Sequence, residues 1–121
     1  MMNTAAALYN FYSGFGLPAY AIGSVPETAV LPYITYNLVE TDAGEAATHY
    51  AQVWYRSTSN AEILQKVDAI KAAIGQGVRL QCDGGCVVIR PQTPLVQMMT
   101  ELDRPENRSA YINLQINCYH T

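Results

Sequence analysis

The chain has 121 residues, of which half are hydrophobic and only 14% are charged, whereas an average soluble domain is about 25% charged. This composition excludes a disordered chain, and the length suits one hydrophobic core. The net charge of −3 argues against general nucleic-acid binding, which needs a basic surface. Nine tyrosines outnumber two phenylalanines and one tryptophan. Tyrosine has an apolar ring and a polar hydroxyl, so it is common in partly hydrated protein interfaces. We therefore expect a globular domain that binds other protein chains.

The first 26 residues carry no charged side chain, which raises the question of a targeting or membrane segment. A signal peptide needs a basic start, and none is present. Asn10, Gly14 and Pro18 interrupt the run before it reaches the about 20 apolar residues of a membrane span. Three cysteines form no closed disulfide framework, so we expect folding in a reducing cytosol.

The first third of the chain predicts a helix and a loop. Over residues 4–13, Leu8, Phe11 and Tyr12 follow helical spacing, Asn3 or Thr4 is placed to cap the start, and glycines follow the end. Residues 17–32 contain three prolines and a glycine and predict an ordered loop.

Two strands are predicted next, over residues 33–40 and 48–57, joined by a small polar loop over 41–47. Together they form a long hairpin. Alternation in the second strand separates two faces. One face has His49, Ala51, Val53 and Tyr55, and the other has Tyr50, Gln52, Trp54 and Arg56.

A helix over residues 60–74 is the clearest element. Ser59 and Glu62 match a capping box, and Ile63, Val67 and Ile70 repeat at helical spacing. Val78–Cys82 and Cys86–Arg90 then predict a hairpin around a three-residue Asp83-Gly84-Gly85 turn, which Pro91 and Pro94 close.

The remaining residues predict a final strand. Residues 95–100 fit a short strand or a helical turn, and residues 101–108 predict an exposed charged loop. Residues 109–119 alternate strictly between apolar and polar side chains, which indicates a strand with one buried face. The order of elements predicts one α+β domain over residues 1–121, with a largely antiparallel sheet of about four to five strands and two helices packed on one face.

No catalytic, metal-binding or cofactor-binding pattern is complete, so we expect neither an enzyme nor a cofactor. Cys82, Cys86 and Cys118 with two histidines lack the second ligand pair of a structural zinc site. The first two cysteines pack as small hydrophobic residues or, if directly opposed across the hairpin, oxidise to a disulfide. His49 and His120 are interpreted as partly exposed residues.

The polar face of the final strand is the main candidate site. It has no charged side chain and consists of Tyr111, Asn113, Gln115, Asn117 and Tyr119. Buried, wet contacts between proteins favour these residue types. Two interpretations remain open: a subunit or partner interface, or a face covered by a helix or loop of the same chain. The acidic residues Glu101, Asp103 and Glu106, among Arg104 and Arg108, form a solvated mixed-charge loop or an intersubunit salt-bridge site.

The layout over nearly the full chain resembles the small tail-terminator, or tail-completion, proteins of long-tailed bacteriophages and prophages. The order of elements and the phrase Pro32-Tyr33-Ile34-Thr35-Tyr36 carry most of this resemblance. The other matching segments are the run from Phe11 to Tyr20, Val25-Pro26, Trp54-Tyr55-Arg56-Ser57, the capped helix, the glycine-rich hairpin, Gln97-Met98-Met99-Thr100 and the alternating final strand.

The resemblance implies a structural virion protein, assembled in the host bacterial cytoplasm, with no catalysis and no cofactor. Its copies would form a ring, typically a hexamer, on the head-proximal end of the tail tube. The partners implied are other copies of the chain, the major tail tube protein and the head connector or head-completion protein, with DNA passing through the lumen without sequence-specific binding. No membrane is involved.

The residues themselves fit a ring subunit in several respects. An acidic balance suits a channel that must not hold phosphates, and a head-to-tail contact that closes by rotation produces a ring. Asp42 and Glu45, in the 41–47 loop, are candidates for a segment that orders on contact with the tube or connector. A phage head-closure or neck protein and a small dimeric protein-binding module are the alternatives.

Overall fold

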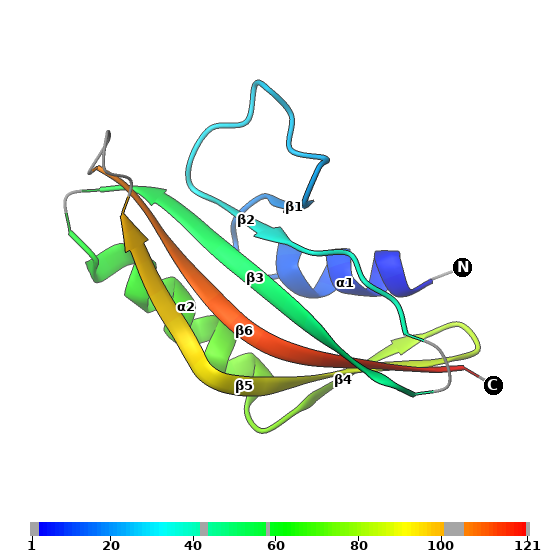
Figure 1. Cartoon of the computed structure of the whole chain (residues 1–121). Coiled ribbons are helices and arrows are strands. Elements are labelled where there is room, and N and C mark those ends of the chain that lie inside the picture. The colour runs from blue at the N-terminus through cyan, green and yellow to red at the C-terminus, as the bar shows by residue number, and fades with distance from the viewer. Residues whose placement is uncertain (1–2, 42–43, 58, 101–105, 121) are drawn as a thin grey trace.

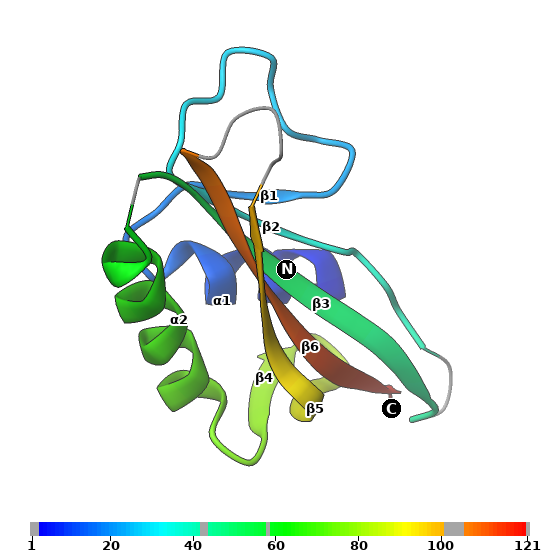
Figure 2. The same ribbon diagram turned by 60° about the vertical axis from the view of Figure 1, so that its left-hand side comes forward.

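The structure is a computed structural model and describes residues 3–41, 44–57, 59–100 and 106–120. Its two helices are α1 (Thr4–Ser13) and α2 (Ala61–Ile74). The strands, in chain order, are β1 (Ala19–Ala21), β2 (Tyr33–Tyr36), β3 (Ala46–Arg56), β4 (Val78–Cys82), β5 (Gly85–Thr100) and β6 (Asn107–His120). Figures 1 and 2 show how these elements are arranged.

One curled sheet of six strands has the order β1-β2-β3-β6-β5-β4. The predicted α+β class is therefore confirmed, with six strands where about four to five were predicted. Only β1 and β2 pair in parallel, so the largely antiparallel character is confirmed too. The additional strand, β1, lies within residues 17–32, which were predicted to form only a loop.

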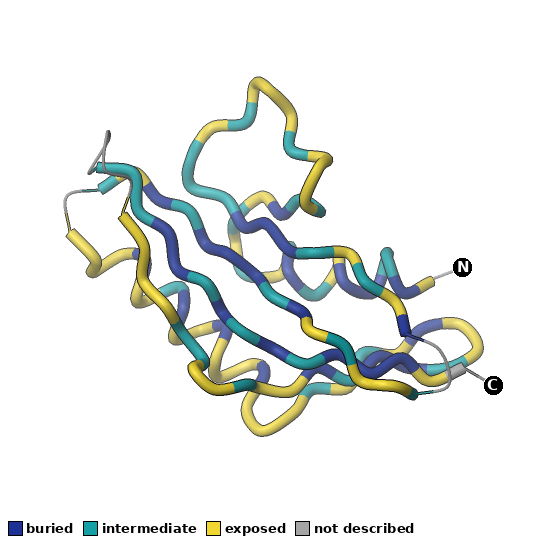
Figure 3. Tube along the Cα trace, in the orientation of Figure 1, coloured by how far each residue is buried: buried dark blue, intermediate teal, exposed yellow. Residues whose placement is uncertain are grey.

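The centre of the sheet is the antiparallel pair of β3 and β6, which runs in register from Ala46 opposite Asn117 to Arg56 opposite Asn107. Inward positions are buried along the middle of both strands, and most outward positions are less buried (Figure 3), with Gln52, Ser109 and Asn117 as buried exceptions. Alternation decides the register because a slip of one residue would turn every apolar side chain toward solvent. The inward and outward faces predicted for residues 109–119 are confirmed.

β5 is one bent strand of 16 residues, although a break at Pro91 and Pro94 was predicted. Its pairing with β6 is irregular only between Pro91 and Val96, where prolines lack the N–H that a regular ladder needs. β4 pairs with β5 around a two-residue Asp83-Gly84 turn, not the predicted three-residue turn. Gly84 has φ of 76°, a conformation that glycine adopts at little cost.

The helix boundaries follow the sequence closely. The Asn3 side chain accepts a hydrogen bond from the Ala6 N–H at 2.9 Å, so the predicted cap of α1 is confirmed. The capping box before α2 is wrong, because the Ser59 hydroxyl accepts from the Ala61 N–H at 3.1 Å instead of reaching Glu62. The Lys66 ammonium donates to the Phe15 carbonyl oxygen and ties α2 to the segment after α1.

The buried side chains of both helices join a single hydrophobic cluster with the inward residues of the sheet. In Figure 1 the two helices lie behind the strands. The largest buried side chains include Tyr12 of α1, Ile63 and Ile70 of α2, and Ile112 and Leu114 of β6.

His49 belongs to this core, and the expectation that it is partly exposed is wrong. Its side chain is completely buried. The Tyr12 hydroxyl and His49 Nε2 are 2.7 Å apart and share a hydrogen bond, and the Tyr12 ring stacks on Tyr36. His49 follows the inward alternation of β3, so its position in the strand decides its burial.

Candidate subunit interface

The sheet surface that points away from the core is the candidate site. Residues paired across the sheet share a face, and Thr35, Gln52, Tyr111 and Gln97 form one row across four strands. We define the outer face by ten uncharged residues: Tyr33, Thr35, Tyr50, Gln52, Trp54, Gln97, Met99, Ser109, Tyr111 and Asn113.

Aromatic rings form the floor of the outer face. Tyr33 packs edge-on against Tyr20 with ring centroids 5.7 Å apart, and Trp54 lies 6.4 Å from Tyr33. Tyr50 and Tyr111 lie 5.6 Å apart on the neighbouring strands. Rings in mutual contact on a sheet are fixed in place, so they offer contact area with little loss of side-chain entropy on binding.

Most polar groups of the outer face already have partners within the chain. Trp54 Nε1 donates to Thr35 Oγ1 at 3.0 Å, and Gln52 Nε2 donates to Ser109 Oγ at 2.9 Å. Asn113 Nδ2 donates to the Pro94 carbonyl at 2.8 Å and to Gln97 Oε1 at 3.0 Å. Burying a polar group costs free energy unless it is hydrogen-bonded. These internal bonds therefore lower the cost of covering the face with another protein.

The face is hollowed in three adjoining places. A hollow of about 340 Å³ extends from Ile22 and Val25 to Tyr50 and Tyr111. A second, of about 450 Å³, continues from Tyr50 and Tyr111 to Met98 and Met99. Because the two share lining residues, the aromatic floor is continuous between them.

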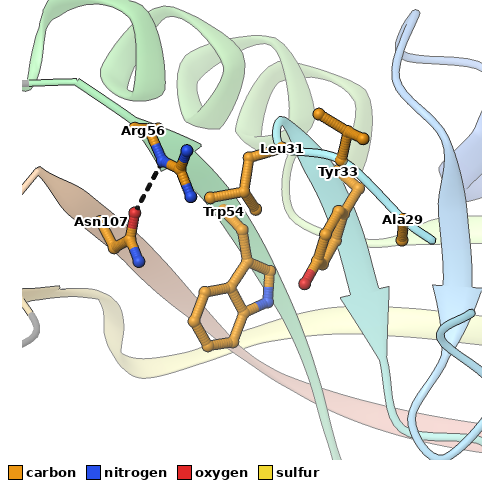
Figure 4. Close-up of a pocket in the computed structure, with 7 residues that line it drawn as sticks. Ala29, Leu31, Tyr33, Trp54, Arg56 and Asn107 are labelled. Atoms are coloured by element: carbon orange, nitrogen blue, oxygen red, sulfur yellow. Dashed lines mark hydrogen bonds between the residues drawn. The ribbon is translucent and has the colours of Figure 1, made fainter. Parts of the chain in front are cut away.

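The third hollow lies against an extended loop. We call residues 22–32 the arm, and it projects away from both helices in Figures 1 and 2. The arm's Leu31 borders a hollow of about 440 Å³ that Tyr33 and Trp54 also line, with Arg56 bonded to Asn107 at its rim (Figure 4). Ile22 and Val30 of the arm are 47% and 78% exposed.

The predicted interface strand is divided between two environments. Tyr111 and Asn113 lie on the open outer face, with their side chains half-buried. Asn117 is 6% exposed, and its amide Nδ2 donates to the Gly44 carbonyl at 2.8 Å. Gln115 bonds Asn117 at 3.1 Å, so this part of the strand is bound to the chain's own loop. The interpretation that a loop of the same chain covers the face therefore holds for Gln115 and Asn117, while an interface at Tyr111 and Asn113 stays a prediction.

Tyr119 and the predicted acidic residues have different surroundings. The Tyr119 ring lies beside Gly44, yet the side chain is 41% exposed. Glu45 is exposed at the start of β3, and Asp42 lies outside the described residues. Of the mixed-charge loop, residues 101–105 also lie outside them. Arg108 donates to the Ser57 carbonyl and to Asn60 within the chain.

The sequence analysis did not include Tyr50 and Trp54, two large aromatic residues of the outer face, in the candidate site. The alternation predicts that Tyr50 and Trp54 lie on the face of their strand opposite His49, but the predicted site includes only the final strand and the acidic residues of the 41–47 loop. The available signal was the register of the two strands, because pairing Gln52 with Tyr111 puts both sets of side chains on one surface.

The cysteines give no sign of a chemical centre. Cys82 is opposite Gly85 and Cys86 is opposite Gln81, so the directly opposed cysteine pair considered from the sequence is wrong. All three thiols are free and buried, and burial raises the pKa of Cys82. Among the described residues, no group of three histidine, cysteine or acidic side chains is placed to hold a metal ion.

No protein-family model matches the chain, and no curated protein matches its sequence significantly. In the described ranges, neither helix has the length and apolar character needed to cross a membrane.

Proposed function

We propose that this chain is a structural subunit of a bacteriophage tail. In this role its copies form a ring, typically a hexamer, that caps the head-proximal end of the tail tube. The ring ends tube polymerisation and provides the surface that joins the head connector. The observation that carries the proposal is the outer face: a broad surface of aromatic and uncharged polar side chains, bordered by Arg56, whose polar groups are largely paired within the chain.

The character of this face favours a structural protein contact over a small-ligand site. Interface cores are depleted in charge and enriched in aromatic side chains and methionine, as the outer face is. A site for a polar ligand needs free donors and acceptors that converge on it, whereas the amides of Gln52 and Asn113 already donate within the chain. The resemblance of the sequence to tail-terminator proteins suggests that this contact is made within a phage tail.

The net charge of −3 agrees with a ring around a DNA channel. Fixed positive charge binds phosphates strongly and without sequence specificity, which would hinder passage of the genome. A virion subunit also needs at least two contact surfaces to close a ring. The arm and the outer face offer two distinct surfaces on one small domain.

The test uses tubes assembled from the major tail tube protein of the same phage or prophage genome, which the proposal requires. We expect the purified chain to bind one end of each tube and to shorten the mean tube length when it is present during polymerisation. Electron microscopy measures both effects, and native mass spectrometry measures the size of the ring.

Two variants make this test specific to the outer face. Tyr111→Ala removes a ring that lines two of the hollows and should weaken end-capping at least about tenfold, as central aromatic contacts do. Tyr9→Ala removes a 51% exposed tyrosine from α1 and should leave capping unchanged. Equal effects of the two variants would contradict a role for the outer face.

The alternatives predict different results. A head-closure or neck protein would bind the connector and leave tube length unchanged. A fixed dimer that ignores tubes would favour a small protein-binding module. Either result would overturn the tail-terminator proposal.

A further inference from the structure

The end of β5, from Val96 to Thr100, lies at an edge of the sheet. On one side it pairs with β6, with Val96 opposite Ile112. β4 pairs only with the earlier part of β5, between Gly85 and Ile89. In the part of the chain that the structure describes, no other strand pairs with residues 96–100. We call this segment the open edge.

The open edge lacks the features that usually block a strand edge. Proteins protect such edges with charged side chains, prolines or a covering element. Pro91 and Pro94 precede this segment, and Arg79 stands on β4. The open edge itself has no charge and no proline, and Met98 and Met99 are 39% and 49% exposed. An unprotected edge of this kind favours pairing with another chain.

The hydrogen bonds of β6 show how its main-chain groups are directed. The Cys118 N–H donates to Thr41 Oγ1, and the Cys118 carbonyl accepts from the Gly44 N–H just before β3. The Glu106 carbonyl accepts from the Ser57 N–H, just after β3. Because main-chain groups alternate in direction along a strand, even-numbered residues of β6 bond toward β3 and odd-numbered residues bond toward β5.

This alternation identifies the outward main-chain groups of the open edge. Gln97 and Met99 are opposite odd-numbered residues of β6, so their N–H and C=O groups point toward β6. Those of Val96, Met98 and Thr100 therefore point to the open side. Three donors and three acceptors at every second residue match the main chain of an extended segment, as in binding by strand addition.

α2 provides an apolar surface behind this edge. It crosses behind β5 and begins beyond the open edge (Figure 1). Val96 is opposite the buried Ile112, so Val96 and Met98 direct their side chains to the helix side of the sheet. Lys66 binds a carbonyl just after α1, and helical spacing places Leu64 on the other flank of α2. Leu64 is 42% exposed.

The position of α2 decides what kind of partner fits. A second copy paired antiparallel through the same edge would bring its own α2 into the space that α2 already occupies behind it. A single extended segment adds only the width of one strand, about 4.8 Å. The uncharged edge also disfavours a charged segment, because burying an unpaired charge is costly.

We propose that the open edge binds an extended, uncharged segment of a partner protein as an added strand. The segment runs antiparallel to β5, which is the more stable form of pairing. Its alternate apolar side chains point toward Met98 and Leu64. This binding site goes beyond the proposed tail function and does not depend on it.

The probe is a seven-residue peptide with blocked ends, in which valine alternates with threonine. Hydrogen exchange followed by NMR reads each amide of the chain separately. In the free chain the Val96 and Met98 amides should exchange at least about tenfold faster than those of Gln97 and Met99. Saturating peptide should slow exchange at Val96 and Met98 at least about tenfold, because their N–H groups then donate to the added strand.

Two methylated peptides test whether the peptide binds as a strand. Opposite residues that exchange hydrogen bonds share a face of the sheet, so the valines that point to the helix side also direct their N–H groups to β5. Methylation of the valine nitrogens should therefore weaken binding at least about tenfold. Methylation of the threonine nitrogens, which face solvent, should leave the affinity within about threefold.

Proline substitutions provide the matching test within the chain. Met98→Pro removes an outward N–H and should abolish peptide binding with little change in the urea midpoint. Met99→Pro removes an N–H that bonds to β6 and should lower the urea midpoint clearly. Leu64→Ala should weaken peptide binding about threefold. Leu38→Ala, which changes a 54% exposed leucine elsewhere, should leave it unchanged.

Several results would overturn the proposal. Equal exchange of all four amides in the free chain would show that the edge is already covered. No peptide binding at about 1 mM, or equal binding of the two methylated peptides, would exclude strand addition. If exchange at Val96 and Met98 slows as the concentration of the chain alone rises, the occupant is a second copy. Tube capping is measured separately with Tyr111→Ala, so the two proposals fail independently.

Discussion

The pair formed by Tyr12 and His49 shows how position in a strand overrides residue type. Histidine is often exposed, but His49 lies between the inward residues of β3 and has no contact with solvent. Its Nε2 shares a hydrogen bond with Tyr12, while Nδ1 has no hydrogen-bond partner among the described residues. The alternation of residues 48–57 indicates this burial, because it puts His49 on the same face as Ala51 and Val53.

Burial of His49 predicts a stability that depends on pH. Burial lowers its pKa from 6.5 to about 4, since the charged imidazolium loses its hydration in the core. Between these values the unfolded chain binds a proton that the folded chain does not. The free energy of unfolding should therefore fall as the pH drops from 6.5 to 4, by about 3 kcal/mol for the whole shift. Urea unfolding at several pH values measures this.

Substitution separates the His49 contribution from that of the carboxylates. His49→Gln has no titrating ring, so its unfolding free energy should change less over this pH range than that of wild type. His120→Gln removes the other histidine and should keep the full pH dependence. Parallel pH profiles for wild type and His49→Gln would contradict the assignment.

At the scale of elements, long alternating or helical segments could be predicted and irregular ones could not. α2 and β6 have enough periodic positions for an unambiguous pattern. β1 has only three residues, Ala19–Ala21, and its pairing with β2 depends on tertiary contacts. β5 was interrupted in the prediction because prolines usually end strands, but Pro91 and Pro94 lie at the irregular stretch where the strand bends.

Gly44, just before β3, lies against the end of β6: its N–H donates to the Cys118 carbonyl and its carbonyl accepts from Asn117 Nδ2. It has φ of 79°, and an added Cβ would lie 2.6 Å from the Tyr119 ring. Gly44→Ala should therefore displace the loop or the ring and lower the free energy of unfolding. Gly23→Ala is the matched control, because Gly23 has φ of 91° and nothing within 4 Å of an added Cβ. The Gly44 variant should lose about 1 kcal/mol more than the control, since a crowded Cβ adds to the backbone cost.

Tyr119→Ala provides the decisive comparison for this loop. Without the ring, Gly44→Ala and Gly23→Ala should differ much less in urea unfolding, as expected when two residues in contact are coupled. A Gly44→Ala cost that is the same with and without the Tyr119 ring would show that the loop does not depend on this contact.

For the whole molecule, the sequence predicted that β6 has an uncharged polar face, but it did not predict how far the open surface extends. The uncharged residues of β6 indicated a protein contact, and Tyr111 and Asn113 do lie on the open outer face. The sequence could not show that Gly44 covers Asn117, because that hydrogen bond joins residues 73 positions apart. It also could not join Trp54 to the same surface without the register of β3 and β6.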